Sequence, residues 1–419
     1  MESTAQQLHY QKTQVFFGTG EEKKLEQWIK TLVPPLSCIV LLSDTKTRDK
    51  TNRLFEKKLF RLGYRVFTHT VTNSSSFTTA ICNDIFIPEE TKVIVGCGDG
   101  GMAALTKYFA ESRGLTAAFI ALDPTMLSAL TPSAVLLHNG VEEIFAVKPF
   151  RSILCDPDFF TTAHKDALPV AFGELVSKCV ALFDYQFAHF LAKEPFDFEI
   201  MHKGYAIIDS ALEFFSAPFS PSFLEKIAEL SIKFSELTQK MGNSRLLCGG
   251  ESQTAHAMNL LFLHEERALR LRGEVEMFVA PIVMNLYQST LLQKRSFFVA
   301  PPDNNARLHY LCEFFGLTQQ RIMNKIRPIL SNSEVDLMTY RLDEYREELS
   351  ELAMKNSSRL QRGWKIFKRL YTDDGYALRK EIDSSDVSIA LALAPDLKNK
   401  FTFLTALKCM GLLESYIGE

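Results

Sequence analysis

The first 160 residues alternate short apolar runs with amphipathic segments. The apolar runs are rich in β-branched residues and predict strands at 38–42, 64–68, 93–95 and 117–120. Helical spacing of apolar positions predicts helices over 47–61 and 102–111. The runs 134–137 and 144–147 flank Asn139-Gly140 and predict a hairpin. Such alternation is typical of a parallel sheet with helices on both faces, as in Rossmann-like dinucleotide-binding domains.

Beyond about residue 160 the pattern is almost wholly helical. Apolar residues recur every three or four positions in 174–191, which predicts one buried helix face. The segments 202–216, 222–241, 253–271 and 306–330 continue this pattern, 301–305 reads as a loop, and the charged segment 341–380 predicts solvated helix. We therefore predict an α/β dinucleotide-binding-type domain over 1–160 and an all-α domain over 161–419.

Composition and charge indicate which classes of partner and which cell compartment to expect. The 419 residues carry a formal net charge of −3, which implies neither nucleic acid nor an anionic membrane as a partner. Residues 1–7 do not read as a secretory signal, and Asp123, Pro124 and Pro132 interrupt the most apolar stretch before membrane-spanning length. The eight cysteines lie far apart without CxxC spacing and predict buried thiols. We expect a cytoplasmic protein that does not enter membranes.

A glycine-rich turn follows the predicted strand 93–95 and precedes the helix that begins near Met102. A glycine turn between strand and helix lets the backbone approach a pyrophosphate, whose charge the helix N-terminus stabilises. Glycine turns also serve as tight connections only. The turn alone leaves both interpretations open.

The continuation of this turn resembles a family motif. Segment 98–108, GDGGMAALTKY, resembles the GSGTxNDxTKY segment of bacterial glycerol-1-phosphate dehydrogenases, which are relatives of glycerol dehydrogenase, iron-containing alcohol dehydrogenases and dehydroquinate synthase. Further resemblances follow in the same order at 123–127 (DPTML), 172–178 (FGELVSK) with Asp184-Tyr185, 249–258 (GGESQTAHAM) and 398–404 (KNKFTFL). The resemblance implies a dehydroquinate synthase-like fold, an NAD(P)-linked oxidoreductase acting on an alcohol or polyol phosphate, and a homodimer.

The same resemblance implies the cofactor-binding residues. They are Asp44, Gly98, Asp99, Gly100, Gly101, Lys107 and Thr125. Two departures from the motif stand out, because Asp99 replaces a small polar residue and Ala104 replaces an aspartate. A carboxylate beside a pyrophosphate repels it, so we predict that NAD or NADP binds weakly or not at all. For Asp44 an alternative stays open, in which its side chain caps the helix that begins near Thr47.

The resemblance implies that this chain lacks two of the family's three metal ligands. In the family a divalent ion, held by one carboxylate and two imidazoles, polarises the substrate oxygen for hydride transfer. The three ligand positions correspond to Glu174, Ser252 and Arg272, and neither a serine hydroxyl nor a guanidinium is a suitable ligand. His256 matches a motif histidine that is not a ligand, and His264 lies in a charged, exposed segment. We therefore predict that the metal is lost.

Arg272 is then expected to pair with Glu174. The pair is either a structural ion pair, or Arg272 polarises a carbonyl group or binds phosphate.

Three functions follow from these possibilities. The first is a metal-independent oxidoreductase of glycerol-1-phosphate dehydrogenase type, with Glu174, Arg272 and His256 at the catalytic position. The second is a catalytically inactive relative, a pseudoenzyme that acts as a binding or scaffold protein and pairs with an active paralogue. The third is a lyase or cyclase of dehydroquinate synthase type. A small phosphorylated polyol or another small anion is the expected ligand.

Overall fold

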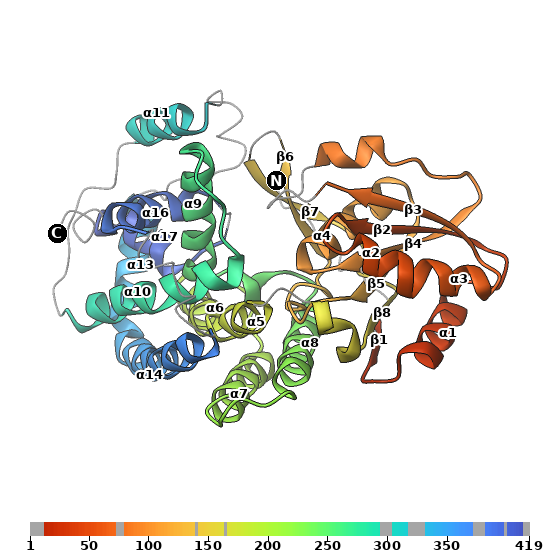
Figure 1. Cartoon of the computed structure of the whole chain (residues 1–419). Coiled ribbons are helices and arrows are strands. Elements are labelled where there is room, and N and C mark those ends of the chain that lie inside the picture. Colours follow the sequence, from red (N-terminus) through yellow and green to blue (C-terminus); the bar gives the residue numbers. More distant parts are fainter. Residues whose placement is uncertain are drawn as a thin grey trace. The chain divides into compact units, whose positions relative to one another are not determined.

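The computed structural model (Figure 1) describes residues 12–72, 79–138, 141–162, 166–293, 304–316, 332–371, 382–397 and 400–413. Packing divides the chain into two compact units. Unit 1 comprises residues 1–171 and 219–244, and unit 2 comprises 172–218 and 245–419. The chain thus returns to the first unit at residues 219–244. Hydrophobic periodicity along the sequence does not indicate this return.

Unit 1 contains a six-stranded parallel sheet. Its strands are β1 (Gln14–Phe17), β2 (Cys38–Asp44), β3 (Arg65–Val71), β4 (Thr91–Gly98), β5 (Thr116–Ala121) and β8 (Ser152–Cys155). The spatial order is β1-β8-β5-β4-β2-β3, and every neighbouring pair is parallel. The predicted parallel sheet is confirmed. Strands β1 and β8 were not predicted, because they have four residues each and are too short to show a period.

A separate two-stranded sheet pairs β6 (Ser133–His138) with β7 (Val141–Ala146) in antiparallel register. The predicted hairpin is therefore confirmed, although Asn139 and Gly140 themselves lie outside the described residues. The predicted helix 47–61 is a continuous helical stretch in three parts, α2 (Arg48–Thr51), a π-helical turn (Asn52–Glu56) and α3 (Lys57–Arg61).

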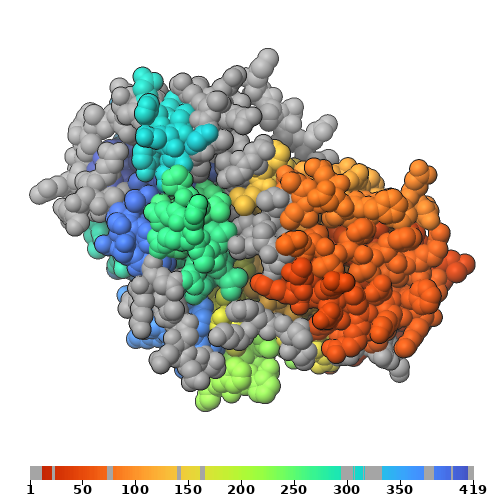
Figure 2. Space-filling model, turned by 45° about the horizontal axis from the view of Figure 1, so that its top comes forward, coloured from red at the N-terminus to blue at the C-terminus, as the bar shows by residue number. Residues whose placement is uncertain are grey.

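Each face of the main sheet has its own hydrophobic core, because side chains of a buried parallel strand alternate between two covered faces. On one face, Val40 and Ile94 pack with residues of α4 (Gly100–Ser112) and α8 (Phe223–Met241). On the other face, Leu41 and Val95 pack with Trp28 of α1 (Glu21–Leu32). Figure 2 shows the outer surface of this unit, much of it formed by the orange part of the chain between α3 and α4. The two cores fix the carboxyl ends of β2, β4 and β5.

Unit 2 is helical throughout the part of the chain that the structure describes. Its helices are the end of α5 (Ala167–Val176), α6 (Lys178–Ala192), α7 (Phe198–Phe214), α9 (Gly250–His264), α10 (Arg272–Leu292), α11 (Asn304–Phe315), α13 (Asn332–Glu344), α14 (Arg346–Leu370), α16 (Ser384–Leu397) and α17 (Phe403–Cys409). The predicted all-α character is confirmed. Helix α10 is long and apolar enough to cross a membrane by length and composition alone, yet more than half of it is buried, as in the core helix of a soluble protein.

Several predicted boundaries are wrong. The helix predicted over 174–191 is two helices that meet at Ser177. The predicted loop at 301–305 gives way to α11 from Asn304 onward, and residues 301–303 lie outside the described ranges. The predicted solvated segment 341–380 contains α14, which buries a stripe of residues that includes Leu349, Leu360 and Phe367. Residues 317–330 and 372–380 are not described.

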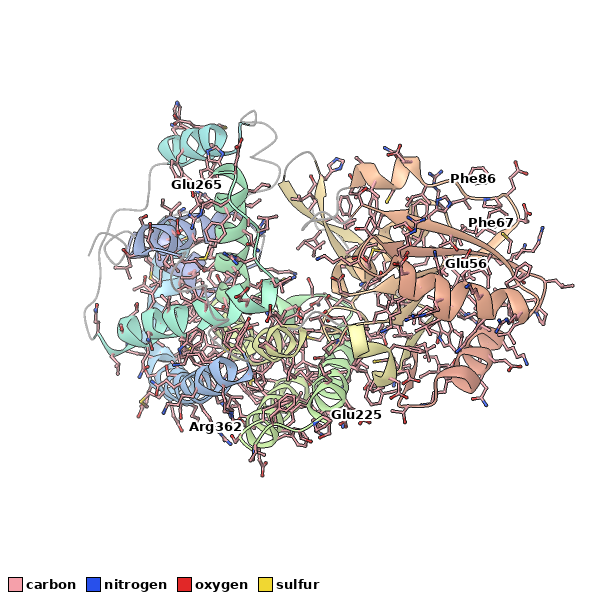
Figure 3. All side chains as sticks on the ribbon, viewed as in Figure 1. Glu56, Phe67, Phe86, Glu225, Glu265 and Arg362 are labelled. Atoms are coloured by element: carbon pink, nitrogen blue, oxygen red, sulfur yellow. The ribbon has the colours of Figure 1, made fainter. Side chains whose placement is uncertain are left out.

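The helix predicted over 253–271 ends at His264, and a loop over 265–271 leads into α10 (Figure 3 labels Glu265). Glu266 adopts a left-handed backbone conformation with φ 57°, which ends the helix. Arg267 forms two hydrogen bonds, of 2.8 and 3.0 Å, with the Asp386 carboxylate at the start of α16. Asn259 both donates to and accepts from the backbone of Arg270. Tertiary contacts therefore override the helical period of this segment.

Candidate functional site

The glycine turn of unit 1 joins the end of β4 to the start of α4. Gly98 has φ 154°, and a Cβ atom there would lie 2.7 Å from Cγ of Met102. A Cβ on Gly100 would lie 3.0 Å from the backbone oxygen of Thr125. Glycine is required at the first of these positions by both backbone and space. The structure thus brings Gly98, Gly100 and Thr125, all singled out from the sequence, to one turn.

Asp99 caps helix α4. Its Oδ1 accepts hydrogen bonds from the backbone N–H groups of Gly101 (3.0 Å) and Met102 (3.1 Å). These N–H groups belong to the first turn of the helix, where a bound phosphate would find its donors. A carboxylate of the chain itself therefore occupies donors that a pyrophosphate would use.

Two further aspartates bind the loops at neighbouring strand ends. Asp44, at the end of β2 and 3% exposed, accepts from Thr47 N (2.7 Å) and Thr47 Oγ1 (2.6 Å) in the turn before α2. The N-cap of α2 is Thr47, and no side chain caps that helix, so Asp44 binds the preceding turn and is not the helix cap considered from the sequence. Asp123 accepts from Thr125 N (2.8 Å) and Thr125 Oγ1 (2.5 Å). Burial raises the pKa of Asp123 to about 6, and the charge of Asp99 contributes to the rise.

Lys107 lies inside unit 1 and faces carbonyl groups. Its Nζ donates to the backbone oxygens of Ser128 (3.1 Å) and Thr131 (3.0 Å), and the residue is 2% exposed. Burial lowers the pKa of Lys107 to about 7. This lysine therefore holds the turn at 128–131, a structural role that the cofactor-binding interpretation did not consider.

In unit 2, the residues at the family's ligand positions lie at the ends of three helices. Glu174 is half-buried on α5, where its neighbour Gly173 packs so closely on α10 that an added Cβ would lie 2.5 Å from the Gly273 oxygen. Ser252 lies in the first turn of α9, is 2% exposed, and its hydroxyl has no hydrogen-bond partner. His256 follows one turn later on α9 and is also buried.

Arg272 opens α10 and pairs with Glu276 one turn further along the same helix. The distance from Arg272 Nε to Glu276 Oε1 is 2.8 Å, and the side chains are 37% and 0% exposed. Glu276 was not among the predicted site residues. Its position four residues after Arg272 is the signal that could have indicated it.

Lys178 extends this pair into a buried network. Its Nζ lies 2.7 Å from Glu276 Oε2 and 3.0 Å from Glu251 Oε1. Burial disfavours charge on Glu276, yet Lys178 and Arg272 together lower the pKa of this carboxyl group. Burial raises the pKa of Glu251 against the opposing effect of Lys178. We call Lys178, Glu251, Arg272 and Glu276 the ion network; it contains two cations and two carboxylates.

A third buried carboxylate of unit 2, that of Asp184, binds the first backbone N–H groups of two helices. Asp184 of α6 accepts from the first backbone N–H groups of α9 (Gly250, 2.7 Å) and α17 (Phe403, 2.8 Å), and from the Tyr287 hydroxyl (3.2 Å). Burial raises the pKa of Asp184 to about 7, although these N–H donors oppose the rise. Asp184 thus joins four elements of unit 2 at one point.

Across the described ranges, no three histidine, cysteine, aspartate or glutamate side chains are grouped closely enough to hold a metal ion. The chemistry of the ligand positions agrees poorly with the family's ion, since Arg272 brings a positive charge and Ser252 a neutral hydroxyl.

Comparison with known proteins gives the family likeness. No protein-family model matches the chain. The glycerol-1-phosphate dehydrogenase [NAD(P)+] of Halalkalibacterium halodurans is 23% identical over 208 residues, covering 49% of this chain and 52% of the relative. The enzyme of the same name from Bacillus velezensis is 22% identical over 246 residues, covering 56% and 61%. The chain therefore spans between half and two thirds of the length of these curated relatives.

Solved structures match over nearly the whole chain. An archaeal halo-thermophilic alcohol dehydrogenase from a Red Sea brine pool has a TM-score of 0.61 at 12% identity, covering 98% of this chain and 97% of that one. An iron-containing alcohol dehydrogenase from Thermotoga maritima gives 0.51 at 12%, covering 86% and 98%. The chain has the fold of the iron-containing alcohol dehydrogenases. The glycerol dehydrogenase of Schizosaccharomyces pombe shares this fold, with a TM-score of 0.53 at 14% identity over 87% and 93% of the two chains. The family resemblance and the two-part fold predicted from the sequence are confirmed.

Proposed function

We propose that this chain is a metal-independent relative of the glycerol-1-phosphate dehydrogenases. It binds small molecules but does not carry out the metal-dependent hydride transfer of that family. The observation that carries the proposal is the pair between Arg272 and buried Glu276, 2.8 Å apart, at a position where the family motif has a metal-binding histidine. A guanidinium at that position repels a divalent ion and offers it no lone pair.

The charge balance of the ion network supports the same conclusion. Two cations and two carboxylates sum to zero without a metal. Since burying an unbalanced charge is costly, a further divalent ion here would have to displace or separate existing pairs. No step of a reaction is therefore assigned to a metal.

We infer that a nicotinamide nucleotide binds weakly. The turn that contains Gly98 and Gly100 joins the end of β4 to the N-terminus of α4, an arrangement that lets a protein backbone approach a phosphate group and so favours a nucleotide there. Asp99 opposes it, because its carboxylate takes the N–H groups of Gly101 and Met102 and adds a negative charge. We further propose a cytoplasmic protein that binds a small phosphorylated polyol or another small anion and forms a homodimer or pairs with an active paralogue.

The test is an activity measurement with added metals. Purified protein is assayed for NAD(P)+ reduction with glycerol 1-phosphate, with zinc, nickel or iron and with a chelator. We expect no metal-dependent activity. The variant Ser252→His/Arg272→His restores two imidazoles beside Glu174 and should gain tight binding of Co²⁺, visible in its absorption spectrum. Metal-dependent turnover by the unmodified protein would refute the proposal.

One observation favours a second candidate, a metal-free oxidoreductase. The Arg272 side chain is 37% exposed, so its guanidinium could polarise a substrate oxygen in place of a metal. In that case chelator-resistant turnover of glycerol 1-phosphate should be present and should be lost in Arg272→Gln. The control Arg362→Gln, on an exposed part of α14 labelled in Figure 3, should retain it.

A further inference from the structure

We propose that Glu251 and Glu276 form a cation site whose resident cation is the ammonium group of Lys178. When the Lys178 side chain is removed, the same site should accept a free primary ammonium ion. The proposal deepens the proposed metal-free function and rests on it, because it says which group supplies the positive charge at the centre of the helical unit.

The geometry is that of an ion held between two anions. The ammonium of Lys178 lies 2.7 Å from Glu276 Oε2 and 3.0 Å from Glu251 Oε1, with side-chain exposures of 1% for the lysine and 0% for both glutamates. The three residues come from three helices, α6, α9 and α10. The cation therefore joins the N-terminal parts of these three helices, where water does not compete for it.

A second observation points to capacity for more donors at this place. The other carboxylate oxygen of Glu251, Oε2, is buried and has no hydrogen-bond partner, and the same is true of the hydroxyl of the adjacent Ser252. Buried polar atoms in folded proteins are nearly always hydrogen-bonded, so such an oxygen indicates an acceptor that another N–H donor could fill. A small ammonium ion, free to rotate, can supply that donor.

Charge decides between a monovalent and a divalent occupant. Without Lys178, the remaining members of the network are two carboxylates and one guanidinium, with a sum of −1. One monovalent cation restores neutrality, whereas a divalent ion leaves an excess positive charge next to Arg272. Two oxygens on different helices also fall short of the six or more ligands that Mg²⁺ or Ca²⁺ prefers.

The experiment uses Lys178→Ala in the full chain. Relative to lysine, alanine lacks three carbons and the amine, so propylammonium has the shape of the missing group. Urea unfolding is followed with increasing propylammonium chloride, and with tetramethylammonium chloride, which has no N–H donor, as the ionic-strength control. We expect a saturable rise of the urea midpoint of Lys178→Ala with propylammonium only. Lys203 is an exposed lysine of α7 that is paired with Glu199. The urea midpoints of the unmodified protein and of the control variant Lys203→Ala should not change with propylammonium.

Two results would overturn the proposal. One is an equal effect of both salts on Lys178→Ala, and the other is no effect of either. If Lys178→Ala does not fold, Lys178→Ala/Glu251→Gln removes a negative charge together with the lysine and should fold without responding to propylammonium. A double variant as unfolded as the single one would contradict the charge-balance argument. Metal bound to the unmodified protein would instead count against the proposed function, so the two failures can be told apart.

Discussion

The glycine turn of unit 1 and the ion network of unit 2 each contain a charged residue that the family motif lacks, Asp99 and Arg272. The two charges have different kinds of partner. Asp99 is accommodated locally, by two backbone N–H groups within three residues of it. Arg272 is accommodated partly through contacts remote in sequence, since its partner Glu276 also binds Lys178, 98 positions away. We expect the capping carboxylate to change what the turn can bind, and the buried network to affect the stability of unit 2.

The largest expected effect is a difference in stability between a variant of the ion network and a variant of the glycine turn. Lys178→Met should destabilise the protein by about 3–5 kcal/mol, because it leaves two buried carboxylates without their shared cation. Asp99→Ala should cost about 1 kcal/mol, the usual loss for an N-cap. Urea denaturation of both variants measures the difference. Equal and small losses would show that the network does not stabilise unit 2.

Asp184→Ala should destabilise the protein by about 2–3 kcal/mol, because the first N–H groups of α9 and α17 would be left buried without an acceptor. Thermal or chemical denaturation measures this loss. Asp209→Ala, which removes an exposed partner of Arg359, is the matched control and should cost well under half as much. A loss no larger than that of the control would contradict the assigned role.

The carboxyl group of Asp184 should make the stability of the protein depend on pH. Its pKa is about 7 in the folded protein and about 4 in an unfolded chain, so the folded state holds the proton more tightly. The resulting stabilisation is fully present below about pH 4 and is lost as the pH rises to about 7. The stability difference between the unmodified protein and Asp184→Asn should therefore fall across this range and stay constant above it. A difference that rises with pH would show that the hydrogen bonds of Asp184 outweigh its burial.

A smaller effect concerns the partner of Arg272. A double-mutant cycle with Arg272→Met and Glu276→Gln should give a coupling of about 1 kcal/mol, kept modest because the guanidinium is 37% exposed. The parallel cycle with Glu174→Gln tests the pair that the sequence predicts. A larger coupling to Glu174 would make Glu276 the secondary partner.

An effect of similar, small size is expected on nucleotide binding. Asp99→Ser should tighten NAD(H) or NADP(H) binding by roughly 1 kcal/mol, because it removes a negative charge beside the first turn of α4. Calorimetric titration measures the change, and Asp49→Ser, an exposed position on α2, serves as the control. Indistinguishable affinities for Asp99→Ser and the unmodified protein would show that this carboxylate does not face a bound nucleotide.

The sequence predicted what depends on short-range patterns. Alternating apolar runs indicated the parallel sheet and the hairpin, which the structure contains. Motif spacing singled out Arg272 and the glycine turn, and their functional roles stay predictions. It did not predict the end of α9, since the pair between Arg267 and Asp386 spans 119 positions. It also missed Lys178 and Glu251 as partners, because they meet only when α6 and α9 pack together. Contacts between distant segments leave no period in the sequence from which they could be inferred.

The central claim is that the ion network, and not a metal, supplies the positive charge near Glu174, Ser252 and Arg272. Elemental analysis of the purified, dialysed protein tests it most directly. We predict no stoichiometric zinc, nickel or iron in the unmodified protein and about one Co²⁺ per chain in cobalt-loaded Ser252→His/Arg272→His. One tightly held metal per chain in the unmodified protein, released by Glu174→Ala, would contradict the account.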